Sequence, residues 1–334
     1  MIEKLLAYCL ANPYLLAAML IVGLVLLVKG ADWLVDGASA MAKRFGISDL
    51  VIGLTVVAFG TSMPEFVVNM VSVAQGATDL ALTNILGSNI INTFVILGLT
   101  AVVYPITSQK RSRDFDIPMS MAAGFLVFAF VAVQSPFGED GRGVTRMGGI
   151  VLLLMFIYFL YNTFRHAKDH PEEAEEQAVK PMSIGLAIVC VLCGLAGLVL
   201  GGEMIVKSAV QIATDLGVSE AIIGLTVVAL GTSLPELATS VIAATKKNCD
   251  IALGNVIGSN IFNVFFVLGT SAVVRPLPAY DGIEMDAWMA AIGSMMVWMF
   301  VKTNKQRQVK RWGGALLLLV YAGYLTYRLI SLNV

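Results

Sequence analysis

The sequence predicts an all-α membrane protein whose ten transmembrane helices form two inverted repeats of five. Three observations support this fold class. Of the 334 residues, 57% are hydrophobic and only 13% are charged, whereas about 25% of the residues of a soluble domain are charged. Apolar windows long enough to cross a bilayer follow one another along the chain. A motif of thirteen residues, Gly53–Glu65, recurs in the second half of the chain as Gly224–Glu236 with eleven identical positions.

Ten apolar windows predict the ten helices. They span residues 13–40, 50–74, 82–104, 117–134, 145–163, 182–210, 220–245, 253–274, 286–301 and 312–330. The first window lacks a basic leading stretch and a small-residue cleavage site, so we expect a first membrane helix and not a removed signal peptide. The first and sixth windows are long enough to predict strongly tilted helices, or helices that extend past the membrane surface.

The repeat divides the chain into two homologous units. In the register that the motif sets, Gly30–Gly98 aligns with Gly201–Gly269 without a gap. We therefore expect one five-helix unit at residues 1–163, a charged cytoplasmic loop at 164–181 and a second five-helix unit at 182–334. Because five is odd, the second unit must begin on the opposite side of the membrane from the first. This predicts repeats that are inverted about an axis in the membrane plane.

The positions of Lys and Arg predict the orientation. With the N-terminus outside, fifteen of the 22 Lys and Arg residues fall in cytoplasmic loops, six fall outside and one lies in the first helix. Cytoplasmic loops are enriched in these residues. We therefore expect a multi-pass protein with both termini outside, whose main partner is the lipid bilayer.

Several other functions are disfavoured by the composition. The net charge of −1 gives no indication of a nucleic-acid partner. The four cysteines show no disulfide framework, and Cys190 and Cys193 lie in an apolar helix as small packing residues. We expect both histidines in the loop between the units, which disfavours a Ser–His hydrolase within the membrane. We expect no enzyme activity, no cofactor and no obligate protein partner.

The two copies of the motif predict interrupted helices that each carry a buried acid. Pro64 and Pro235 lack an N–H and clash with the carbonyl four residues back, which breaks a helix. Unwound backbone at membrane depth is tolerated only where it is buried in protein or lines a wet cavity. A charged group there costs at least ~2.5–3.5 kcal/mol and marks an ion path or a paired site. We therefore expect the second and seventh helices to be discontinuous, with Glu65 and Glu236 facing the centre.

The polar residues of these segments form an all-oxygen ligand set. Ser88 and Asn92 share a helical face at a spacing of four, and Ser259 and Asn263 repeat the pattern. Carboxylates, amides, hydroxyls and carbonyls suit hard cations such as Ca²⁺ and Na⁺, which the two acids can neutralise. The competing interpretation is close helix packing. It is equally good for the glycines and for the residues Asn84, Asn89, Asn255 and Asn260. We interpret Asp32, Asp36 and Glu203 as interfacial or capping residues.

At both Gly-Thr-Ser-x-Pro-Glu and both Gly-Ser-Asn-Ile-x-Asn segments the chain resembles the Na⁺/Ca²⁺ exchanger family of the cation/Ca²⁺ exchanger superfamily. The resemblance covers nearly the whole chain, and the short central loop is similar to that of prokaryotic members. It implies a prokaryotic inner (plasma) membrane location and a central Ca²⁺ site formed by Glu65 and Glu236 with Thr61 and Thr232. It also implies flanking Na⁺ sites with Asn92 and Asn263 at the middle. Their further ligands would be Ser62, Ser233, Ser88, Ser259 and the carbonyls of Ala58 and Ala229.

The resemblance implies a secondary antiporter that exchanges Na⁺ for Ca²⁺ by alternating access, with the first and sixth helices sliding across a fixed site. Some relatives carry Asp where this chain has Asn263, and an acid there is associated with K⁺ co-transport. Asn263 therefore disfavours K⁺ dependence. It leaves H⁺/Ca²⁺ (or other divalent cation) exchange as an alternative, and an ion channel as a third hypothesis that the inverted design disfavours.

Overall fold

The structure is a computed structural model that describes residues 12–133, 142–170, 182–217, 229–280 and 282–331. Within these residues the regular secondary structure is helical except for four strands of two residues each, and short turns connect the elements. Seven helices are long and apolar enough to span a membrane, and the bent pair Asp49–Thr61 and Met63–Gln75 adds an eighth if it is one span. The all-α membrane fold is thereby confirmed. The count of ten stays a prediction, because 218–228, in the seventh window, lies outside the described residues.

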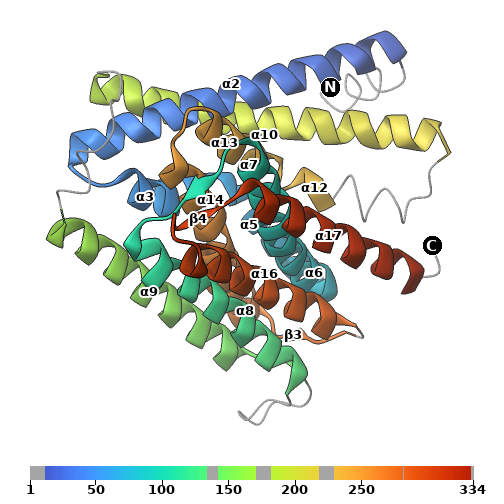
Figure 1. Ribbon diagram of the computed structural model, residues 1–334. Helices are drawn as coiled ribbons and strands as arrows, with labels where there is room; N and C mark the ends of the chain where they lie inside the picture. Colours follow the sequence, from blue (N-terminus) through green and yellow to red (C-terminus); the bar gives the residue numbers. More distant parts are fainter. Residues whose placement is uncertain (1–11, 134–141, 171–181, 218–228, 281, 332–334) are drawn as a thin grey trace.

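Two long helices lie side by side along one face of the molecule (Figure 1). They are α2 (Pro13–Phe45) and α10 (Ile184–Asp215). Asn12 caps the N-terminus of α2, where its side chain accepts hydrogen bonds from two backbone N–H groups. Gly46 caps the C-terminus in the left-handed conformation (φ 65°). The helix thus extends past the end of its apolar window, because it stops at this glycine and not where the hydrophobic run ends.

Glycines allow the backbones of α2 and α10 to touch. A Cβ atom on Gly30 would lie 2.8 Å from the carbonyl oxygen of Gly194, and one on Gly201 would lie 2.7 Å from that of Gly23. Because Gly23 meets a later turn of α10 and Gly30 meets an earlier one, the helices run antiparallel. Small residues at such crossings permit close van der Waals packing in membranes.

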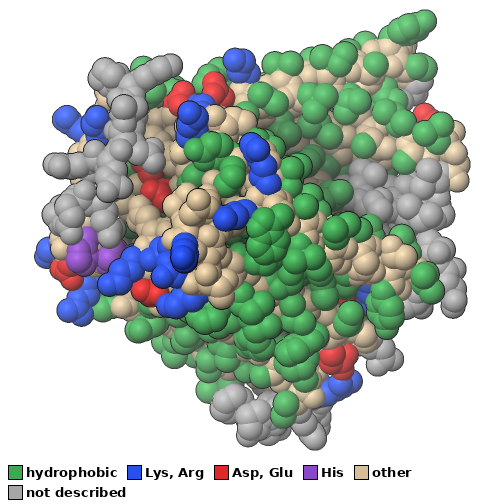
Figure 2. All heavy atoms as spheres, viewed as in Figure 1, with side chains coloured by type: hydrophobic (Ala, Val, Ile, Leu, Met, Phe, Trp, Pro, Cys, Tyr) green, Lys and Arg blue, Asp and Glu red, His purple; other side chains and the backbone are tan. Residues whose placement is uncertain are grey.

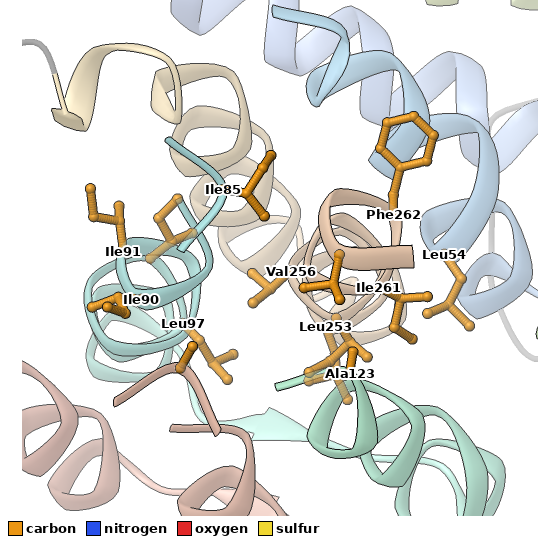
Figure 3. Close-up of a cluster of buried hydrophobic side chains, with 14 of the residues drawn as sticks. Leu54, Ile85, Ile90, Ile91, Leu97, Ala123, Leu253, Val256, Ile261 and Phe262 are labelled. Carbon is orange, nitrogen blue, oxygen red and sulfur yellow. The ribbon is translucent and has the colours of Figure 1, made fainter. Parts of the chain in front are cut away.

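The centre of the fold consists of two corresponding sets of short helices. Helix α6 begins at Thr78 and helix α14 begins at Cys249, which are equivalent positions of the two repeats. The first set is α3 (Asp49–Ile52), η1 (Gly53–Val57), α4 (Ala58–Thr61), α5 (Met63–Gln75), α6 (Thr78–Ile90), η2 (Ile91–Ile96) and α7 (Leu97–Val103). The second set is α12 (Ala229–Gly231), α13 (Leu234–Thr245), α14 (Cys249–Ile261), η6 (Phe262–Leu268) and α15 (Gly269–Val274). Apolar side chains of α6, η1 and α8 (Ile117–Ala132) gather around α14 (Figure 3).

The π-helical turns η1, η2 and η6 were not predicted. In each of them one extra residue is accommodated inside an otherwise α-helical segment, and such turns are frequent at functional sites. Two of them, η2 and η6, begin at Ile91 and Phe262, directly before Asn92 and Asn263.

The outer helices and two small strand pairs complete the fold. The helices are η3 (Ser112–Asp116), α8 (Ile117–Ala132), α9 (Arg146–Asp169), α16 (Ile283–Thr303) and α17 (Arg311–Ser331). Strand β1 (Ile106–Thr107) pairs antiparallel with β4 (Gln308–Val309), and β2 (Gly143–Val144) pairs with β3 (Leu277–Pro278). Each pair therefore joins the first half of the chain to the second half.

The boundary between the halves differs in detail from the expected one. Helix α9 continues to Asp169, beyond the expected end of the first unit at residue 163. The remainder of the expected loop includes 171–181, which lies outside the described residues. Hydrophobic side chains cover much of the surface seen in Figure 2, while most of its Lys and Arg side chains lie in the left half of the view.

Candidate cation site

The site is built on two helix interruptions at the repeated motif. In the first copy, α4 ends at Thr61 and α5 begins at Met63, with a bend of 45° between the flanking segments. In the second copy, α12 ends at Gly231 and α13 begins at Leu234. The intervening Ser62 and Ser233 adopt nearly the same backbone angles, with φ of −87° and −91° and ψ of 7° in both. The predicted interruption is therefore present at both motifs.

Each interruption places one acid in the first turn of the helix that follows. Glu65 lies in the first turn of α5 and Glu236 in the first turn of α13, and both side chains are fully buried. The free N–H groups and the dipole of a helix N-terminus favour negative charge. Among the described residues, neither carboxylate forms a salt bridge with a Lys or Arg. The positive partner that a buried carboxylate requires is thus not supplied by a basic side chain.

The two carboxylates are held together by crossed hydrogen bonds. The hydroxyl of Ser62, in the first motif, donates to Oε1 of Glu236 at 2.7 Å. The hydroxyl of Ser233, in the second motif, lies 3.5 Å from Oε1 of Glu65. Since each serine contacts the acid of the opposite motif, the two interruptions face each other across a common centre.

Serines of the following helices complete the two carboxylate environments. Ser88 of α6 lies 3.5 Å from Oε1 of Glu65, and Ser259 of α14 lies 3.4 Å from Oε1 of Glu236. In both acids the second oxygen, Oε2, is buried and accepts no hydrogen bond from the described part of the chain. The structure therefore leaves one oxygen of each carboxylate available to a cation.

Two buried amides lie one helical turn after these serines. Asn92 and Asn263 are fully buried, and the Oδ1 atoms of both have no hydrogen-bond partner among the described residues. The Nδ2 of Asn263 donates to Asn89 at 3.2 Å. Buried polar atoms are nearly always hydrogen-bonded, so these oxygens fit the role of ligands for a hard cation.

A second layer of amides holds the acid-bearing helices in place. Nδ2 of Asn255 donates to the backbone carbonyl of Glu236 at 3.2 Å and to Ser240 at 2.9 Å, while its Oδ1 accepts from Thr61 at 3.1 Å. The corresponding amide of Asn84 lies 3.4 Å from the carbonyl of Glu65.

The role of these asparagines was left open between packing and function, and here they connect helices by hydrogen bonds. Asn84 also donates to Asn69 at 2.7 Å, and Asn69 in turn donates to Ser271 of α15 at 3.3 Å. Asn69 was not identified from the sequence, because its counterpart Ser240 breaks the identity between the repeats. The identity of Asn84 and Asn255 in both copies was the available signal.

The remaining site residues predicted from the sequence, Ala58, Ala229 and Thr232, lie at or next to the two helix interruptions. The carbonyl of Ala58 accepts the N–H of Ser62 at 3.1 Å and faces the Thr61 hydroxyl at 3.4 Å. Ala229 is the first residue of α12. Thr232 is half-buried in the turn after α12 and, unlike fully buried Thr61, it lines two cavities.

One of these cavities, of about 320 Å³, leads from Ser88 and Thr232 to a buried ion pair. Arg328 of α17 contacts Asp286 of α16 at 3.3 Å, and the Tyr324 hydroxyl donates to Asp286 at 2.7 Å. In the loop before α16, burial raises the pKa of Tyr280 to about 12, so its hydroxyl remains a neutral donor to Asp286. Asp286, Tyr324 and Arg328 of this cluster line the same cavity as Ser88 and Thr232.

Comparison with known proteins identifies a family for both halves of the chain. The sequence profile of the family described as "Sodium/calcium exchanger protein" matches residues 15–165 and 186–330. The sodium/calcium exchanger MaX1 of Methanosarcina acetivorans is 33% identical over 342 residues, covering 92% of this chain and 96% of that protein. The inner membrane protein YrbG of Escherichia coli is 38% identical over 274 residues, covering 78% of this chain and 81% of that protein.

Solved structures of the sodium–calcium exchanger NCX_Mj share the fold. One of them, soaked with Na⁺ and Ca²⁺, superposes with a TM-score of 0.78 at 32% sequence identity and covers 93% of this chain and 98% of the other. The match therefore extends over both halves of the chain.

Proposed function

Because this chain belongs to the sodium/calcium exchanger protein family, whose members are transmembrane antiporters without a cofactor and not enzymes, we propose that it exchanges Na⁺ for Ca²⁺. Cation exchange involving Ca²⁺ is the function of the family. The proposal adds the coupling ion and the site, with Ca²⁺ bound at the midplane between Glu65 and Glu236.

A single observation carries this proposal. The crossed contacts from Ser62 to Glu236 and from Ser233 to Glu65 bring both acids to one buried point. Two carboxylates without a basic partner among the described residues can neutralise one Ca²⁺ or about two Na⁺, so the two ions compete for the same oxygens. Competition for one site is the basis on which the downhill movement of Na⁺ drives Ca²⁺ in the opposite direction.

The remaining oxygens are assigned by their position. The Ca²⁺ site and the flanking Na⁺ sites would be completed by the hydroxyls of Thr61, Thr232, Ser62, Ser233, Ser88 and Ser259, the carbonyls of Ala58 and Ala229, and the amides of Asn92 and Asn263. The Oδ1 atoms of the two amides have no hydrogen-bond partner in the part of the chain that the structure describes, which supports their inclusion. Protein oxygens then take the place of the water molecules that surround the cation in solution. The cation can regain this water when it is released to either side, so binding is reversible.

Alternating access requires the site to open to each side in turn, which inverted repeats allow. We infer that the units 1–163 and 182–334, joined by 164–181, are related by inversion, and that the α2–α10 pair slides across the acids. Two observations support the inversion and the sliding. The strand pairs β1–β4 and β2–β3 each join the first half of the chain to the second half, and α6 and α14 begin at equivalent positions of the two repeats. The Lys and Arg side chains that lie mostly in one half of the view in Figure 2 support termini outside, and the relative YrbG supports a prokaryotic inner membrane.

Uptake of radioactive Ca²⁺ by proteoliposomes loaded with Na⁺ tests the proposal. We expect uptake that requires the Na⁺ gradient and that is abolished by Glu65→Gln and by Glu236→Gln. Glu203→Gln is the matched control, because Glu203 is exposed and pairs with Lys207 on its own helix. Uptake that survives either substitution of a buried acid would reject the assignment.

Proton coupling is the second candidate. The Ca²⁺/H⁺ antiporter ChaA of Bacillus subtilis is 23% identical over 229 residues, covering 64% of each chain. Two buried carboxylates can also be neutralised by protons. In the same vesicles, Ca²⁺ uptake driven by a pH gradient in the absence of Na⁺ would favour this candidate over Na⁺ exchange.

A further inference from the structure

Helices α2 and α10 pack backbone against backbone, so we expect the two helices to move together. Along the contact, backbone faces backbone at Gly23, Gly30 and Gly37 of α2 and at Gly194 and Gly201 of α10. A Cβ on Gly37 would lie 2.8 Å from the carbonyl of Ala187, so this close approach extends over more than three turns. What ties this pair to the central helices therefore determines the position of both.

Lys246, which follows the central helix α13, forms ion pairs with α2. Nζ of Lys246, directly after α13, lies 2.7 Å from Oδ1 of Asp32, 3.0 Å from the Asp32 carbonyl and 2.6 Å from Oδ1 of Asp36. We call these three residues the Lys246 clamp. The aspartates lie one turn apart on α2, so one ammonium group bridges both.

A second contact reinforces the clamp. Asn248, two residues further along the chain, donates to Ser39 of α2 at 3.1 Å and to Asp49 at 2.6 Å. The Ser39 hydroxyl lies 3.4 Å from the same oxygen of Asp49. Both contacts join the second half of the chain to α2.

The equivalent residues of the other repeat cannot form the same ion pairs and hydrogen bonds. In the register of the two repeats, Lys246 corresponds to Gln75, Asp32 to Glu203 and Asp36 to Lys207. Lys207 pairs with Glu203 within α10 at 3.1 Å, and no ion pair joins these two residues to α5 in the described part of the chain. Asn248 and Ser39 correspond to Ala77 and Val210, whose side chains have no hydrogen-bonding group.

The structure itself is open on the side without the clamp. A cavity of about 370 Å³ lies between α10 and the first turns of α5 and α13, lined by Met63, Pro64, Val206, Lys207 and Pro235, although α10 also contacts α13 beside it. On the clamped side, α2 packs directly against α13. The two ends of the sliding pair are therefore held differently.

We propose that the Lys246 clamp is an electrostatic latch that sets the balance between the two access states, by holding the α2–α10 pair closed at the end where Lys246 lies. This inference rests on the proposed alternating access. The clamped side chains are only partly buried, with exposed fractions of 28% for Lys246, 37% for Asp32 and 42% for Asp36. Such contacts weaken when salt shortens the Debye length from about 10 Å at 0.1 M to about 3 Å at 1 M.

Electron-spin distance measurements test the latch without depending on transport. Spin labels would be attached at Phe45→Cys, the exposed end of α2, and at Val103→Cys of α7, in a variant whose native cysteines are replaced. In the parent protein we expect one dominant distance. Lys246→Gln should raise the population of a second distance about 5- to 10-fold at low salt, and the parent should approach this distribution at about 1 M salt.

Lys246→Arg keeps the charge and should keep the parent distribution. Lys207→Gln removes a lysine of α10 that pairs only within its own helix in the described part of the chain, so it should shift the distribution by less than about 2-fold. An unchanged distribution in Lys246→Gln, or an equal shift in Lys207→Gln, would overturn the latch. In vesicles, Lys246→Gln should lower the KM for Ca²⁺ at the clamped face by a similar factor, because a binding-competent state that is more populated binds with higher apparent affinity. If the parent exchanges no cations, the proposed function fails, while the spin-label distances still decide whether the latch exists.

Discussion

Replacing Glu236 by the neutral, nearly isosteric Gln should stabilise the cation-free protein while abolishing its response to Ca²⁺. Two fully buried carboxylates that share one centre, with no basic partner among the described residues, carry the full cost of desolvation and mutual repulsion. Replacement of buried charges by neutral groups of similar volume is often stabilising by about 1–4 kcal/mol. The hydrogen bond from Ser62 at 2.7 Å offsets part of this cost, because a bond to a charged group is worth about 1.5–3 kcal/mol. We therefore expect a net gain of about 1–2 kcal/mol in the free energy of unfolding.

The response to Ca²⁺ should change in the opposite direction. A ligand present at 100 times its Kd stabilises the folded state by about 2.7 kcal/mol. Glu236→Gln removes one of the two charges that neutralise the cation, so this increment should disappear.

Thermal unfolding in detergent and mildly alkaline buffer, with chelator or with Ca²⁺, measures both effects. Glu203→Gln, at an exposed position on α10, should change neither. A lower unfolding temperature of Glu236→Gln in chelator, or a Ca²⁺ response equal to that of the parent, would refute the reasoning.

Three further substitutions test other parts of the structure. Gly30→Ala would place Cβ 2.8 Å from the carbonyl of Gly194. In thermal unfolding it should therefore lower the free energy of unfolding by about 1–3 kcal/mol. Gly185→Ala is the control, because a Cβ there would meet open space and should not lower this free energy. Asn255→Ala removes the hydrogen bonds to the Glu236 carbonyl and to Thr61. The calorimetric Ca²⁺ affinity should therefore fall about 5- to 150-fold, which corresponds to about 1–3 kcal/mol; unchanged affinity would exclude a positioning role. Asp286→Asn should destabilise the protein by about 1–3 kcal/mol yet leave the KM for Ca²⁺ within about 2-fold, and a large KM change would instead make this cluster part of the ion path.

The sequence was informative where identical local chemistry occurs twice. The fold class followed from apolar windows, and the interruptions at Ser62 and Ser233 followed from proline after Gly-Thr-Ser. The gathering of Glu65 and Glu236 followed from the cost of a buried charge. These are local rules, and the two repeats supplied independent instances of each. Whether all of the predicted ligands bind a cation remains a prediction.

Other features depend on contacts that no local pattern encodes. The π-helical turns at η2 and η6 arise where an extra residue must fit between packed helices, and no residue type marks them. Asn69 forms its hydrogen bonds to Asn84 and Ser271 only after distant helices assemble. Asp32 and Asp36 were interpreted as interfacial or capping residues, whereas the structure shows both bound to Lys246, in the other half of the chain.

A crystal structure with Ca²⁺, or with Sr²⁺ located by its anomalous scattering, tests the central claim most directly. We expect one cation within about 2.3–2.6 Å of a carboxylate oxygen of Glu65 and of a carboxylate oxygen of Glu236. A cation bound by only one of these acids, or a cation bound elsewhere while both carboxylates stay without one, would contradict it.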